Sequence, residues 1–133
     1  MTGSASVSTT AVPTAFSVTG GGSFCDGGTG VNVGLGGSVT GVNYQLYNGA
    51  TASGSVISGT GSTLSFGIVA AAGNYSVVAS NPATGCSRSM SGGASITILP
   101  LPVVQTVTGG GIYCLDGTGV NVGLSGSAIG VTY

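Results

Sequence analysis

Apolar side chains alternate with polar or small ones along most of this chain. The period is two in residues 31–35, 42–47 and 64–68, which is the period of a β-strand with one buried face. Shorter or weaker alternation covers residues 14–19, 55–58, 74–79 and 94–98. Gly-rich, Asn-Gly and Asn-Pro steps separate these segments and are turn signals. The pattern therefore predicts about seven short strands per folded unit.

Helix signals are weak by comparison. The best candidate is the run of three alanines at 70–72, and Gly73 ends it at once. Asn48-Gly49, between two alternating segments, is typical of a tight hairpin turn. Seven short strands with frequent turns predict an all-β, immunoglobulin-like Greek-key sandwich.

The apolar positions of these strands are the expected core. Tyr75 also resembles the tyrosine of a tyrosine corner, although packing in the core is the simpler interpretation. The core residues expected from the alternation are Val31, Val33, Leu35, Tyr44, Leu46, Leu64, Phe66, Tyr75, Val77, Ile96 and Ile98.

The end of the chain repeats its beginning. Val18-Thr-Gly-Gly-Gly-Ser-Phe-Cys25 returns as Val107-Thr-Gly-Gly-Gly-Ile-Tyr-Cys114, and the heptapeptide at 29–35 returns unchanged at 118–124. Both offsets are 89 residues (107 − 18 and 118 − 29), and 24 of the 44 pairs from 1/90 to 44/133 are identical. A period of this length is close to one immunoglobulin-like domain and predicts tandem repeats of 89 residues.

The period sets the expected domain boundaries. Residues 1–11 correspond to the last strand of a preceding repeat, 12–100 to one complete repeat, and 101–133 to the front of the next. We therefore expect the chain to be a window from a longer array. Pro100 and Pro102 form the expected joint between repeats, because alternate prolines favour a short, extended and semi-rigid connection.

Charge is nearly absent from the chain. Its ionised side chains are Arg88, Asp26 and Asp116, for a net charge of −1, and Lys, Glu, His and Trp do not occur. Nucleic acids and anionic membranes need a basic patch, so neither is an expected partner. No run of about 18 apolar residues predicts insertion into a membrane. A near-neutral surface favours association with other copies. The alternative is a secreted domain whose solubility comes from glycans or from the rest of the chain.

Enzymatic chemistry is not expected from this inventory. General acid–base catalysis needs suitable titratable groups, and Asp26 and Asp116 do not even occupy equivalent repeat positions. Calcium prefers several carboxylates and zinc several Cys or His ligands, so we expect no metal and no cofactor. The triple glycines at 20–22 and 109–111 lack the Lys and the helix of a phosphate-binding loop. They instead indicate positive φ angles or close backbone approach.

Three cysteines follow the repeat. Cys25 and Cys86 belong to the complete repeat, and Cys114 is Cys25 one period later. We expect a Cys25–Cys86 disulfide, with Cys114 unpaired because the partner falls outside this window; two free thiols are the alternative. The bridge would enclose about 60 residues and stabilise the domain by roughly 4 kcal/mol. It would also imply an oxidising compartment.

The repeated segments resemble a known class of repeats. They are similar to the immunoglobulin-like repeats of very large Bacteroidetes cell-surface proteins of the gliding-adhesin or surface-filament type. The segments that carry this resemblance are 18–25, 30–35, 42–47, 73–79 and 84–86. The Trp-Asp and Gly-Asp-Gly signature of PKD-type repeats is absent. The resemblance implies a secreted structural module at the cell surface.

Together these features predict a structural, extracellular, non-enzymatic repeat that builds a stalk or filament for cell adhesion. Its expected partners are neighbouring repeats of the same chain and further copies in a homo-oligomer. The alternative is an adhesin that binds a surface glycan or protein through its loops. Any secretion signal would lie outside the window, because residues 1–11 contain no basic residue and no apolar core.

Overall fold

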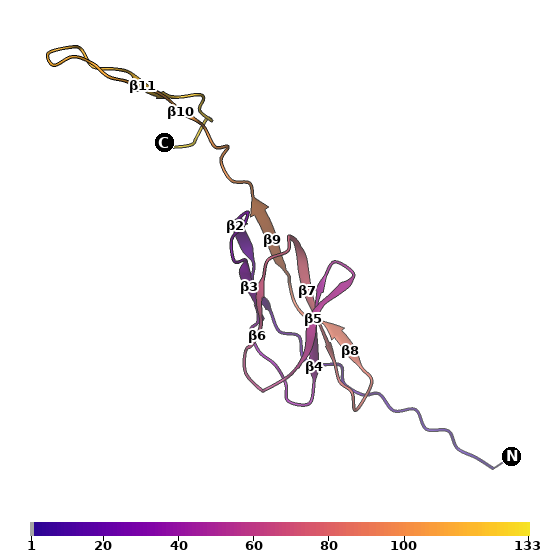
Figure 1. Cartoon of the computed structure of the whole chain (residues 1–133). Helices are drawn as coiled ribbons and strands as arrows, with labels where there is room; N and C mark the ends of the chain where they lie inside the picture. The colour runs from indigo at the N-terminus through magenta and orange to yellow at the C-terminus, as the bar shows by residue number, and fades with distance from the viewer. Residues whose placement is uncertain (1) are drawn as a thin grey trace. The chain divides into compact units, whose positions relative to one another are not determined.

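The computed structural model describes residues 2–133, and its secondary structure there is entirely β. The chain divides into two units, Met1–Leu99 and Pro100–Tyr133, which are described separately. The first unit contains nine strands, labelled in Figure 1: β1 (Val18–Gly20), β2 (Gly22–Cys25), β3 (Val31–Leu35), β4 (Asn43–Asn48), β5 (Thr51–Ser58), β6 (Leu64–Val69), β7 (Gly73–Ser80), β8 (Ser87–Ser89) and β9 (Ala94–Leu99).

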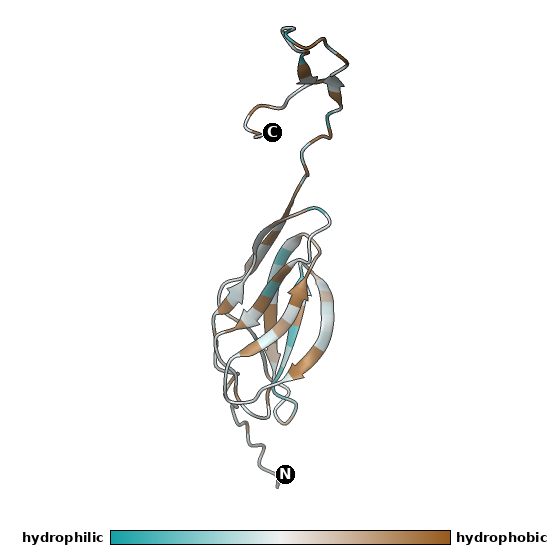
Figure 2. Cartoon of the chain, turned by 60° about the vertical axis from the view of Figure 1, so that its left-hand side comes forward, coloured by the Kyte–Doolittle hydropathy of each residue, from teal (hydrophilic) through white to brown (hydrophobic). Residues whose placement is uncertain are grey.

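These strands form two sheets, an arrangement consistent with a β-sandwich. One sheet has three strands in the order β1-β3-β6. The other has the order β2-β9-β7-β4-β5, with β8 also paired to β7. All pairs are antiparallel except β2 with β9, which run parallel. Brown and pale segments alternate along the strands in Figure 2, as expected where each strand buries one face.

The turn predicted at Asn48-Gly49 joins β4 to β5. Asn48 pairs with Thr51, so the loop contains two residues, and the first of them, Gly49, has φ 58°. A glycine at the first central position is what a type II′ hairpin turn requires. The local signal therefore predicted this connection correctly.

The core lies between the two sheets, and most of the predicted core residues belong to it. Tyr44, Val33 and Val77 are fully buried, and Leu35, Leu46, Leu64, Tyr75 and Ile96 are buried as well. Val31 and Phe66 are only partly buried but pack against the cluster. The alternation did not identify four further buried residues: Val42, Ala79, Met90 and Ala94.

The prediction for Ile98 was wrong, because this side chain is 36 % exposed. The pairing of β9 with β7 ends at Ile96, which faces Gly73 at the start of β7. Beyond that point β9 continues with β2 alone, where Ile98 faces Phe24. The alternation of β9 therefore extends past the end of the sandwich that would bury it.

The triple glycine carries the chain from one sheet to the other. β1 ends at Gly20 in the three-stranded sheet, and β2 begins at Gly22 in the larger sheet. Gly20, Gly21 and Gly22 all have positive φ, at 90°, 84° and 131°. A Cβ on Gly21 would lie 2.9 Å from the backbone oxygen of Ser95. Both predicted reasons for glycine, positive φ and close backbone approach, are present here.

The second unit contains one hairpin, β10 (Val107–Gly109) with β11 (Val122–Leu124). Its register, Val107 with Leu124, is that of Val18 with Leu35 in the first unit, displaced by 89 residues. The backbone also bends alike, because Asp116 has φ 76° where its counterpart Gly27 has φ 79°. The same local sequence has thus adopted the same local structure twice.

Candidate functional site

The two cysteines of the first unit lie at opposite ends of the larger sheet. Cys25 pairs with Leu99, three residues beyond the point where β9 leaves β7 at Gly73. Cys86 directly precedes β8, which pairs with the other end of β7 at Ser80. β7 has eight residues, so the separation along the strands is more than about 20 Å at roughly 3.3 Å per residue.

The prediction of a Cys25–Cys86 disulfide is therefore wrong. Both thiols are free, as is Cys114 in the second unit. A disulfide needs Cα atoms within about 7 Å of each other, which no small adjustment of this sheet provides. The separation of the two cysteines could not be predicted from sequence order, because the sequence does not reveal at which ends of the strands they lie.

Cys86 has a specific environment at the N-terminal end of the domain. The half-buried thiol lies 3.3 Å from the hydroxyl oxygen of Thr10, and the backbone N–H of Cys86 donates to the hydroxyl of Thr84. Hydrogen bonds from the side chain of Thr10 and then from that of Thr84 lower the pKa of Cys86 below its ordinary value. They do so because a hydroxyl that donates to sulfur stabilises the thiolate. The segment before the first strand thus favours the thiolate form of Cys86.

Replacing Thr10 by Val should slow the alkylation of Cys86 severalfold at pH 7–8. The change removes the donor to the sulfur, so the pKa of Cys86 rises and the thiolate fraction falls. The measurement is the rate of iodoacetamide labelling against pH, in a protein whose Cys25 and Cys114 are replaced by Ser. Thr9→Val is the control on the neighbouring exposed position. An unchanged profile for Thr10→Val would show that the contact does not tune the thiol.

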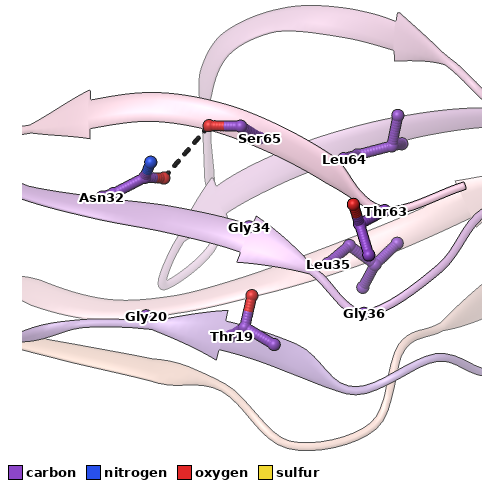
Figure 3. Close-up of a pocket in the computed structure, with 9 residues that line it drawn as sticks. All are labelled: Thr19, Gly20, Asn32, Gly34, Leu35, Gly36, Thr63, Leu64 and Ser65. Atoms are coloured by element: carbon purple, nitrogen blue, oxygen red, sulfur yellow. Dashed lines mark hydrogen bonds between the residues drawn. The ribbon is translucent and has the colours of Figure 1, made fainter.

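A shallow hollow of about 280 Å³ lies on the three-stranded sheet (Figure 3). Asn32 and Ser65, on the paired strands β3 and β6, form its polar side, where the hydroxyl of Ser65 donates to the side-chain oxygen of Asn32 over 3.1 Å. Its lining combines hydroxyl and amide side chains and backbone with the apolar side chains of Leu35 and Leu64, and none of the lining residues is ionisable. Its lining is Thr19, Gly20, Asn32, Gly34, Leu35, Gly36, Thr63, Leu64 and Ser65.

The described residues offer little else that is chemically reactive. Among residues 2–133, no group of three or more His, Cys, Asp or Glu side chains gathers into a metal-binding cluster. That same part of the chain also lacks a helix that is long and apolar enough to cross a membrane. Pro100 and Pro102 are exposed and lie outside the strands, between β9 and β10.

Comparison with protein-family models, with curated proteins and with solved structures found no match to this chain. The functional argument therefore rests on the residues and their geometry.

Proposed function

We propose that this chain belongs to an extracellular structural protein, in which immunoglobulin-like sandwiches in tandem build a stalk or filament for cell-surface attachment. The observation that carries the proposal is the antiparallel strand pair that recurs 89 residues later in the same register. An array of domain-sized units suits a protein whose task is to span distance. The nearly uncharged sequence suits lateral association of such arrays.

The strand order supports the immunoglobulin-like part of this proposal. The chain starts in the smaller sheet with β1, crosses to the larger sheet with β2 and ends there with β9. The hydroxyl of buried Tyr75 donates to the backbone oxygen of Ala71 over 3.0 Å and accepts from the side chain of Asn48. A tyrosine that bonds backbone a few residues upstream is the pattern of a tyrosine corner.

The pairing of the second strand with the last one supports a role under tension. β2 and β9 are parallel, with four paired positions from Gly22–Ile96 to Cys25–Leu99. Pulling the two ends of the domain apart draws β2 toward its N-terminus and β9 toward its C-terminus. The hydrogen bonds between them are then loaded together in shear instead of opening one by one. Such a pair resists extension, as a stalk module must.

Electron microscopy tests the proposal. A chain in which residues 12–100 are repeated several times should appear as straight rods, or as fibres with several chains in cross-section. Sedimentation velocity on the same sample should show an extended particle whose association increases with concentration. Collapsed or randomly flexible particles that stay monomeric at high concentration would contradict it.

The hollow on the three-stranded sheet favours a second candidate, an adhesin that binds glycans. Its uncharged lining with Asn32, Thr63 and Ser65 presents the donors and acceptors that sugar hydroxyls need. Binding to a glycan array that is lost in Asn32→Ala, but kept in Gln45→Ala on the other sheet, would favour this function over a purely structural one.

A further inference from the structure

We propose that a disulfide crosses each junction between repeats, joining Cys25 of one repeat to Cys86 of the repeat that follows. The inference rests on the tandem array of the proposed function and adds a covalent link to it. Each sulfur would then have its partner in a neighbouring domain. One position of the repeat, occupied by Leu99 and by Thr10, carries the argument.

The first step is the place of Cys25 at the C-terminal end of the domain. Cys25 and Leu99 are paired in the parallel ladder of β2 and β9, and the next N–H, that of Asp26, donates to the Leu99 oxygen over 2.8 Å. Paired residues of neighbouring strands lie about 5 Å apart and point to the same face of the sheet. Cys25 and Leu99 are both exposed there.

The second step is the place of Cys86 at the N-terminal end. Thr10 lies 3.3 Å from its sulfur through the hydroxyl oxygen. Thr10 is the counterpart of Leu99 in the repeat before, since 10 + 89 = 99. The contact therefore places the counterpart of the last strand position beside the N-terminal end of the domain that follows it.

The two steps meet at this one position. Leu99 neighbours Cys25 of its own repeat along the ladder, and its counterpart Thr10 lies beside Cys86 of the domain that follows it. Both cysteines are thereby placed beside a single side chain, which is the juxtaposition that a disulfide between them requires. The same arrangement explains why each repeat carries one cysteine at each end.

The chemistry balances with an external disulfide as oxidant. The thiolate of Cys86 attacks a mixed disulfide on Cys25, formed with oxidised glutathione or a disulfide-exchange enzyme. The new S–S bond forms as the external thiolate leaves. Overall, two thiols lose two protons and two electrons, and the oxidant disulfide becomes two thiols.

The single arginine of the chain permits a decisive experiment. We would insert a second copy of residues 12–100, so that all of 1–100 and 101–133 is retained around a complete junction. After refolding in a glutathione buffer and trapping with iodoacetamide, the denatured monomer is cut by trypsin, which cleaves after Arg88 in each copy. Cys25 of the first copy and Cys86 of the second then lie on different fragments, whereas Cys25 and Cys86 of one copy share a fragment.

The expected result is that the first two fragments remain joined without reductant and separate with dithiothreitol. Cys86→Ser in the second copy should abolish the link, and Cys86→Ser in the first copy should leave it intact. If the two repeats fold and form rods but the fragments separate without reductant, the disulfide between repeats is overturned. The proposed tandem array would still stand in that case. Failure of the two-repeat chain to fold, judged by circular dichroism, would overturn both.

Discussion

Replacing Tyr44 by Ala should lower the free energy of unfolding of the first unit by about 4–6 kcal/mol. The ring is fully buried between the sheets, and deleting a buried aromatic side chain costs about 3–5 kcal/mol. Its hydroxyl also accepts a hydrogen bond from the N–H of Val39 over 2.9 Å, and that donor would lose its partner. Because the total free energy of unfolding of a small domain is only about 5–15 kcal/mol, a large fraction of the variant should be unfolded.

Urea denaturation followed by circular dichroism measures this loss, and the second unit supplies a matched control. Tyr133 is the counterpart of Tyr44, since 44 + 89 = 133, and it accepts the equivalent bond from the N–H of Ala128 over 2.9 Å. Tyr133 is nevertheless 58 % exposed, so Tyr133→Ala should change stability by no more than about 0.5 kcal/mol. Equal effects of the two substitutions would show that the local loop contact, and not the core, explains the loss.

Replacing Gly20 by Ala should destabilise the first unit by about 3 kcal/mol or more. With φ 90°, an alanine at this position meets the unfavourable left-handed region, at a cost of about 1–2 kcal/mol. The added Cβ would also overlap the backbone oxygen of Asn32 on β3. The strand must move away from its partner, so β1 and the crossing to β2 are both disturbed.

Gly36→Ala is the control for this prediction. Gly36 has no positive φ, and its nearest contact for an added Cβ is the Ser17 oxygen at 3.5 Å, an ordinary separation. The urea midpoint of unfolding of the Gly36→Ala variant should remain near that of the parent protein. If Gly20→Ala also unfolds at the parent midpoint, then the crossing between sheets does not depend on the left-handed conformation.

The cysteines show where sequence reasoning fails. Counting them within one repeat predicted an internal bridge, yet Cys25 and Cys86 lie at opposite ends of β7 and β9. Which end a residue occupies depends on the order and direction of strands that are distant in sequence. Only after the register was known did the link to the neighbouring repeat become the better hypothesis.

The short strands were missed for a related reason. β2 and β8 have four and three residues, and almost none of their side chains is buried. Such strands leave no alternation of apolar and polar residues, because they form along the partners β9 and β7 and not over the core. The longer strands β3, β4, β6 and β7 each bury one face, and their residues predicted them directly.

The two copies of one segment separate what the sequence by itself determined from what the tertiary structure decided. Val33 and Leu35 pair with the strand before them in the same register as Val122 and Leu124, because turn chemistry and a period of two are properties of the local sequence. Burial is different: Val33 is 0 % exposed and Val122 is 71 % exposed. The first copy has β6 beside it and the larger sheet opposite it. Those strands come from distant parts of the chain, and only their packing turns the alternation into a core.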